Sequence, residues 1–142
     1  MSWMVAEAES IEDLLGRHEG VGRSMHKFLG QLEADEAVPS RLRELCRAQI
    51  EVVHGQQPII SDVVTESVVD ALKRGELTTF AGVELAALSI ASNIPYNHHA
   101  VSDADVTEVT SYLGEQGCVT LLTQCAFWDV QARWRATLGL QN

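Results

Sequence analysis

The chain has 142 residues, which is enough for one domain with a single core and too few for two. It is 46% apolar and its charged residues are spread along the chain, as in a globular protein rather than a disordered one. The net charge of −10 argues against nucleic acid and anionic membrane surfaces as partners, because no basic stripe offsets the repulsion.

Apolar residues recur with a period near 3.6 and no segment alternates as a strand would, so the sequence predicts an all-α protein of about six or seven helices. Two N-terminal helices are expected over residues 7–16 and 21–33. Pro39 and Ser40 suit the start of a third helix. Its apolar stripe runs on to residue 53, and Gly55 is expected to end it.

A further helix is predicted to open at Pro58, because the first turn of a helix tolerates proline. One apolar stripe supports this interpretation: Ile59, Ile60, Val63, Val64, Ser67, Val68, Ala71 and Leu72. Lys73 and Arg74 would lie in its last turn, where the helix dipole favours cations, and Gly75 would stop it.

The C-terminal part of the chain continues the helical pattern. Residues 83–93 predict a short, nearly all-apolar, central helix. Ser102 and Asp105 have the spacing of a capping box that starts a helix to about residue 114. The last helix, about 117–138, is apolar on more than one face. We therefore expect it to be central and in part to face another subunit of a homo-oligomer, whether dimer, trimer or hexamer.

The cysteines and the N-terminal stretch bear on the compartment. Cys46, Cys118 and Cys125 form no Cys-x-x-Cys pair, and the last two would lie about 10 Å apart on one helix, too far for a disulfide. Free, mostly buried thiols in a reducing compartment are expected, with Cys46 in the core. No apolar run approaches the roughly 20 residues that span a bilayer, and the acidic start is unlike a signal peptide. A cytoplasmic protein is expected.

Four stretches carry a resemblance to a known family: "PSRLRELCRAQIEVVHG", "GVELAALSIASN", "HAVSDADVTEVTSYL" and "TLLTQCAFWDVQARWRATLGL". In this order and nearly without gaps, they resemble the carboxymuconolactone decarboxylase / alkylhydroperoxidase D-like family over residues 39–140. The resemblance implies a single domain (1–142) with the helical bundle of that family. Residues 39–140 would form its core, and residues 1–38 would add the N-terminal helices.

The resemblance also implies where chemistry would lie, and shows a departure there. In the peroxidase-like branch a helix glutamate precedes a Cys-x-x-Cys-x-x-x-His motif, and counting from Glu44 those positions hold Gln56, Ile59 and Val63. An amide and an aliphatic side chain provide neither a thiolate nucleophile nor a resolving thiol. We therefore expect a divergent member that lacks thiol peroxidase activity by the family mechanism.

Other polar residues at this corner could replace the lost chemistry. Glu44, Arg47, Glu51 and His54 fall within about 80° of one another on a helical wheel. Glu51 and His54 could form a general acid–base pair. The same stripe also fits a solvated helix face, and both interpretations stay open, although the resemblance places Glu44 in an interior pocket.

The sequence thus yields a first hypothesis of acid–base chemistry on a small organic molecule, and the resemblance suggests an anionic or lactone-like one. The expected catalytic residues are Glu44, Glu51 and His54, and the expected substrate-binding residues are Gln56 and Gln57. A second hypothesis is a non-catalytic binding or scaffold member. A third is a peroxidase-type antioxidant protein, which would need a second thiol within disulfide reach of Cys46.

No metal or other cofactor is expected. Glu51 and His54 have Glu-x-x-His spacing, but a metal site needs a further ligand. His98 and His99 stand in a Pro/Asn-containing loop that is typical of a surface. Glu84 fits either a helix-start charge or a buried family carboxylate, and Arg133 is expected to pair with Asp129, four residues earlier.

Overall fold

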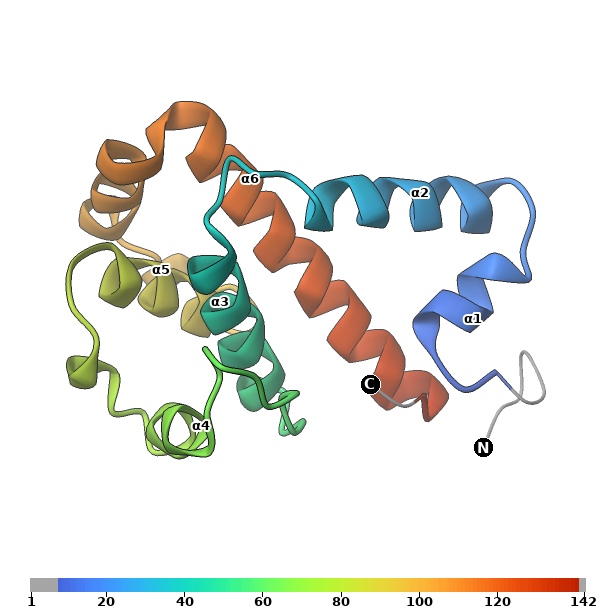
Figure 1. Cartoon of the computed structure of the whole chain (residues 1–142), viewed down its shortest axis with the longest axis horizontal. Helices are drawn as coiled ribbons and strands as arrows, with labels where there is room; N and C mark the ends of the chain where they lie inside the picture. The colour runs from blue at the N-terminus through green and yellow to red at the C-terminus, as the bar shows by residue number, and fades with distance from the viewer. Residues whose placement is uncertain (1–7, 141–142) are drawn as a thin grey trace.

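The structure is a computed structural model that describes residues 8–140, and over that range it contains helices and no strand (Figure 1). Residue 7, where the sequence predicts the first helix to begin, lies outside the described residues, and residues 8–10 are not helical because Ser10 caps a helix that starts only at Ile11. The helices are α1 (Ile11–Gly16), α2 (Val21–Glu33), α3 (Ser40–Val53), α4 (Glu66–Lys73), α5 (Gly82–Asn93) and α6 (Asp103–Leu138), with short 3₁₀ turns η1 (Leu77–Thr79) and η2 (His98–Ala100). This confirms the prediction of an all-α protein of about six or seven helices. None of these helices is both long enough and apolar enough to cross a bilayer.

Helices α3, α5 and α6 form the centre of the fold, as the apolar character of α5 and α6 predicts. Small side chains on α5, including Ala87 and Ala91, are fully buried and let the neighbouring helices approach closely. Ile50 of α3 and Leu121 of α6 are also fully buried in this cluster. Full burial of each such aliphatic side chain contributes about 1.5–3 kcal/mol.

Local signals set both ends and the bend of α6. The Ser102 hydroxyl accepts from the backbone N–H of Asp105 at 3.1 Å, as expected of the capping residue. Gly114 adopts a positive φ of 79° and interrupts the helix, so the chain bends there (Figure 1). Gly139 ends the helix in the left-handed region. The predicted break near residue 114 and the predicted end of the last helix at about residue 138 are both confirmed.

The helix predicted to open at Pro58 is wrong, because α4 begins only at Glu66. The Ser61 hydroxyl accepts from the backbone N–H groups of Val63 and Val64, and a side-chain turn of this kind competes with helix formation. Thr65 then caps α4 by accepting from Val68 N. Residues 54–65 are therefore a connection that passes over α3 rather than the start of a helix.

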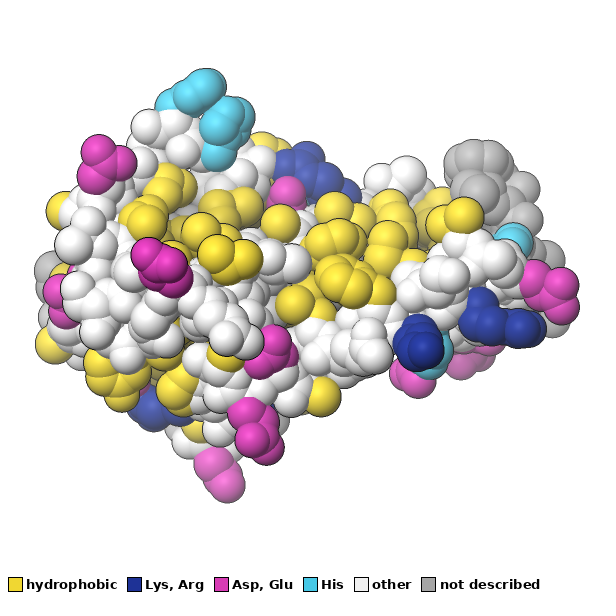
Figure 2. All heavy atoms as spheres, turned by 90° about the horizontal axis from the view of Figure 1, so that it is seen from above, with side chains coloured by type: hydrophobic (Ala, Val, Ile, Leu, Met, Phe, Trp, Pro, Cys, Tyr) yellow, Lys and Arg dark blue, Asp and Glu magenta, His cyan; other side chains and the backbone are white. Residues whose placement is uncertain are grey.

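Helices α1 and α2 form an N-terminal arm that contacts the second half of α6. Ile11, Leu14 and Leu15 pack with Leu140 and Trp134 in a separate apolar cluster. Helix α2 is amphipathic, yet Val21 and Phe28 remain 83% and 39% exposed. Seen from above, apolar side chains gather across the middle of the molecule (Figure 2). The arm thus leaves part of its apolar face uncovered in the single chain.

Candidate functional site

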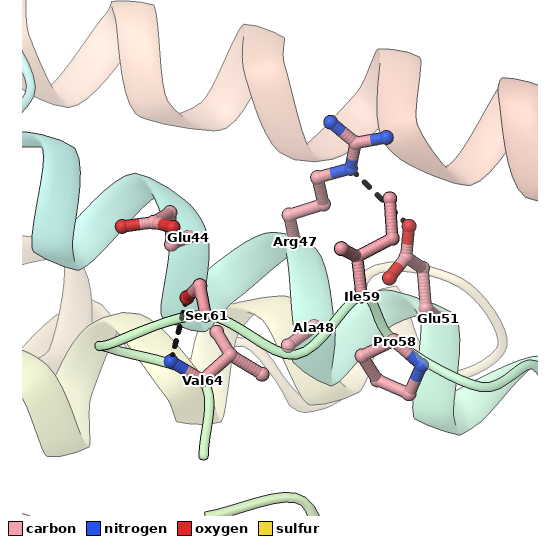
Figure 3. Close-up of a pocket in the computed structure, with 8 residues that line it drawn as sticks. All are labelled: Glu44, Arg47, Ala48, Glu51, Pro58, Ile59, Ser61 and Val64. Carbon is pink, nitrogen blue, oxygen red and sulfur yellow. Dashed lines mark hydrogen bonds and ion pairs between the residues drawn. The ribbon is translucent and has the colours of Figure 1, made fainter.

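A pocket of about 170 Å³ lies between α3 and the connection that follows it (Figure 3). The Ser61 turn bends the connection back over the helix, which places an apolar wall opposite the polar stripe of α3. The lining residues are Glu44, Arg47, Ala48 and Glu51 from α3 and Pro58, Ile59, Ser61 and Val64 from the connection.

Glu51 is a buried carboxylate held between two arginines. Its side chain is 3% exposed, and its Oε1 accepts from Arg47 Nε at 3.2 Å. The same oxygen lies 3.5 Å from Nη2 of Arg135, a buried α6 residue. Burial lowers the pKa of Arg135, and the nearby Glu51 carboxylate opposes that shift. Since a buried charge without a partner is costly, this triad holds its members in place.

Arg135 also fixes the bend of the chain just after α3, at Gln56. Its Nε donates to Gln56 Oε1 at 3.1 Å, and Gln56 Nε2 donates to the backbone oxygen of Ala132 at 2.7 Å. Gln57 Oε1 accepts from Lys73 Nζ at 2.9 Å. Neither glutamine lines the pocket. The expected substrate-binding pair thus joins the corner to α6 and α4.

Glu44 and Arg47 offer the pocket its available polar groups. The half-buried Glu44 carboxylate makes no hydrogen bond or ion pair with another described residue, and it does not point toward the Arg47–Glu51 pair (Figure 3). Arg47 bonds to Glu51 through Nε, which leaves its two Nη groups without a partner in the described chain. One carboxylate and one guanidinium fork therefore remain for a ligand.

His54 does not line this pocket. Its Nε2 lies 2.7 Å from Asp129 Oδ1 on α6, and its Nδ1 lies 3.0 Å from the hydroxyl of Tyr96, which follows α5. The three residues predicted to share one catalytic site are thus divided. Glu44 and Glu51 face the connection, whereas His54 turns toward α6.

Sequence reasoning missed three partners in these clusters: Arg135, Asp129 as a partner of His54, and Tyr96. An arginine within an apolar helix needs a buried counter-ion, so Arg135 did carry a signal. The predicted Arg133–Asp129 pair is confirmed at 3.1 Å, but nothing local links Asp129 to His54. Tyr96 stands in a loop without any pattern of its own.

The cysteines are free and buried, as predicted, and Cys46 is fully enclosed in the core. The structure places Cys125 of α6 beside it. A hydrogen bond with Cys125, together with burial, raises the pKa of the Cys46 thiol. A second thiol thus lies next to Cys46, but both are fully buried. A raised pKa also keeps Cys46 protonated, which is the opposite of what a peroxidatic thiolate needs.

The remaining candidates lie outside the pocket. Glu84 is in the first turn of α5 and accepts from Arg41 Nε at 2.6 Å. His98 and His99 are exposed and lie against each other in η2, with ring centroids 4.0 Å apart. Within residues 8–140, no three His, Cys, Asp or Glu side chains are grouped so that they could hold a metal ion.

Comparison with known proteins found no matching family model, no similar curated protein and no similar solved structure.

Proposed function

We propose that the chain is a divergent carboxymuconolactone decarboxylase / alkylhydroperoxidase D-like protein that acts on a small anionic molecule by acid–base chemistry. The all-helical fold and the sequence resemblance over residues 39–140 support this proposal. The observation that carries it is that one pocket is lined both by Glu44, whose carboxylate has no partner among the described residues, and by Arg47, whose Nη groups are not engaged there either.

Arg47 would bind the anionic group of the substrate. A guanidinium presents a planar fork that matches a carboxylate, and its bonds to a charged acceptor are the stronger kind. Because Arg47 is tied to Glu51 through Nε alone, the fork of Nη groups is held in orientation while staying open. Glu51 and Arg135 are positioning residues in this scheme.

Glu44 would move the proton. It lies three residues before Arg47 on α3, and side chains at this spacing have Cβ atoms about 5–6 Å apart. In this structure the Glu44 carboxylate points away from Arg47, so it would have to turn toward Arg47 to reach the carbon or hydroxyl that adjoins the bound carboxylate of a substrate. A positioned carboxylate can act there as general base and return the proton as general acid.

The size of the pocket favours a small substrate. Its volume of about 170 Å³ is well below the range of about 300–1,000 Å³ that holds drug-sized ligands. Ala48, Pro58, Ile59 and Val64 supply apolar walls, while the charged groups come from one side. A compact organic acid or lactone acid matches this division.

The test uses carboxymuconolactone as the probe, with binding measured by calorimetry and turnover by release of carbon dioxide. Arg47→Gln should raise the Kd by at least about tenfold, which corresponds to about 1.4 kcal/mol. Glu44→Gln should abolish turnover and leave the Kd within about threefold, because it keeps the shape of the pocket. Arg41→Gln, an exposed arginine outside the pocket, is the matched control.

Two results would count against the assignment. Equal affinity in Arg47→Gln and Arg41→Gln would remove the anion-binding role of Arg47. Turnover that survives Glu44→Gln would remove the acid–base role. Hydroperoxide turnover abolished by Cys46→Ser would instead favour the peroxidase-type alternative.

The second candidate function is a non-catalytic binding or scaffold role through self-association. The observation that favours it is the exposure of Val21 and Phe28 on amphipathic α2. Apolar surface of this kind on an ordered helix is typical of an interface. Self-association is also compatible with the catalytic proposal, since the pocket lies between α3 and the connection to α4.

A cytoplasmic location is part of the proposal. Its support is that Cys46 and Cys125 lie in contact and yet are free thiols. Reducing compartments maintain cysteines in this form.

A further inference from the structure

Asp129, His54 and Tyr96 come from separate parts of the chain and form a hydrogen-bonded row. The row lies at the C-terminal end of α3, outside the pocket described above. Asp129 of α6 lies 2.7 Å from Nε2 of His54, and Nδ1 of His54 lies 3.0 Å from the hydroxyl of Tyr96. His54 is nearly buried, with 4% of its side chain exposed, whereas Tyr96 is 66% exposed. The row therefore runs from the interior to an accessible phenol.

Asp129 sets the tautomer of His54. Its Oδ1 also accepts from Arg133 Nε at 3.1 Å, so this oxygen acts as an acceptor toward both neighbours. His54 Nε2 must then carry the proton. In the neutral ring Nδ1 is consequently unprotonated and accepts the hydrogen bond from the Tyr96 hydroxyl.

Arg133 holds the phenol in place through contacts with its ring and with the residue before it. Its Nη2 donates to the backbone oxygen of Pro95, next to Tyr96. Its guanidinium carbon lies 4.9 Å from the centre of the Tyr96 ring. A cation over an aromatic ring is attracted to it, so Arg133 helps to fix the orientation of the Tyr96 ring.

We propose that Tyr96 is a nucleophilic tyrosine that takes an acyl group from an activated ester, with His54 as its general base and Asp129 as the residue that positions His54. The Tyr96 oxygen attacks the acyl carbon while its proton passes to His54 Nδ1. The ester's leaving group departs with its electron pair as an alcoholate or phenolate. The products are an acylated Tyr96 and an imidazolium paired with Asp129.

The arrangement follows the general logic of an activated nucleophile, in which a base lies within hydrogen-bond reach and a third group orients that base. The separations of 3.0 and 2.7 Å lie within that reach. The site shares no residue with the pocket lined by Glu44 and Arg47. The inference therefore stands independently of the function proposed above.

The second tyrosine of the chain supplies a control for the base, because it is similarly exposed and lacks a histidine partner among the described residues. Tyr112 is 65% exposed, close to the 66% of Tyr96, but its hydroxyl makes no hydrogen bond with a histidine among the described residues. The full chain would be treated with p-nitrophenyl acetate, and acetylation at each tyrosine would be followed over time by peptide mass spectrometry. Tyr96 should be acetylated at least about tenfold faster than Tyr112, since general-base catalysis typically contributes 10²–10⁴-fold.

Two variants separate the roles in the row. His54→Gln should bring the Tyr96 rate down to that of Tyr112, because an amide cannot take the proton. Asp129→Asn should also slow Tyr96, because an amide can donate to Nε2 and leave the proton on Nδ1. The Tyr112 rate should stay unchanged in both variants, and an unchanged circular dichroism spectrum checks that the fold is kept.

Equal rates at the two tyrosines of the unaltered chain would overturn the proposal without any variant. Slower acetylation of Tyr96 than of Tyr112 would do so as well, since it would mean that the hydrogen bond only protects the hydroxyl. A Tyr96 advantage that persists in folded His54→Gln would remove the base from the mechanism and with it the inference.

Discussion

The carboxylate of Glu51 and the guanidinium of Arg135 lie 3.5 Å apart, and both side chains are almost fully buried. They join α3 to the last turns of α6, which the connection after α3 also reaches through Gln56. Arg47 shares the same Glu51 oxygen from the pocket side. The orientation of the pocket arginine is therefore coupled to the packing of the two central helices.

Replacing Arg135 should destabilise the protein strongly. Arg135→Met leaves Glu51 buried with Arg47 as its remaining cation, and the loss of one partner from a buried pair typically costs about 3–5 kcal/mol. The measurement is the free energy of unfolding in urea. Arg41→Gln, which breaks an exposed pair with Glu84, should cost no more than about 1 kcal/mol.

A double variant tests the contact between Glu51 and Arg135 by measuring whether the two changes in unfolding free energy add. Glu51→Gln with Arg135→Met removes both charges, so it should be more stable than the sum of the two single changes predicts. Additive losses would show that the two side chains do not interact.

Cys46 should make stability depend on pH in the alkaline range. The contact with Cys125, together with burial, raises the pKa of the folded thiol above the ordinary value of 9.0. The folded chain therefore holds this proton more tightly than the unfolded chain. The resulting stabilisation is complete below pH 9 and is lost as pH rises from there toward the folded pKa. One such proton contributes a slope of up to about 1.4 kcal/mol per pH unit.

The check is urea unfolding between neutral and alkaline pH. The chain with Cys46 should lose stability more steeply above pH 9 than Cys46→Ala does. Cys46 should also react with a thiol reagent only as the protein unfolds. Parallel stability curves, or rapid labelling of the folded chain, would contradict this account.

The Ser61 turn should control the shape of the pocket. Ser61→Ala removes the acceptor for the N–H groups of Val63 and Val64, which should cost about 1 kcal/mol of stability. Affinity for the carboxymuconolactone probe should fall with it, because the connection closes the pocket. Ser67→Ala on the exposed side of α4 is the control and should change neither quantity.

The exposed face of α2 should carry self-association. Introducing charge with Val21→Glu and Phe28→Glu places ionised groups where an interface would need to be dry. The mass from light scattering should then fall to that of one chain, while circular dichroism stays unchanged. His26→Glu, another exposed α2 residue, is the control. A monomeric unaltered chain at every accessible concentration would exclude this role for α2.

The helix boundaries that the sequence predicted correctly are those encoded by neighbouring residues. The stop at Gly55, the cap at Ser102 and the helix end near residue 114 each depend on one residue and its immediate neighbours in the chain. The error at Pro58 arose because β-branched residues at helical spacing resemble an apolar helix face. There the hydroxyl of Ser61 satisfies the backbone in a turn instead.

Sequence reasoning identified residues of the candidate site only where those residues lie on the same helix. Helical spacing suggested that Glu44, Arg47 and Glu51 share a face, and the structure places all three at one pocket. The direction of His54 depends on Asp129 and Tyr96, which belong to distant segments. No periodicity within α3 could disclose partners that tertiary packing supplies.

The bend at Gly114 has a consequence for how two copies of the chain could meet. The positive φ there folds residues 103–113 back, so that Val109 packs among side chains of the same molecule. If that hinge opened into a straight rod, the released segment could regain equivalent burial only on a second molecule, in an exchange of identical parts. The conformation of Gly114 thus keeps residues 103–113 packed on their own chain rather than on a second copy.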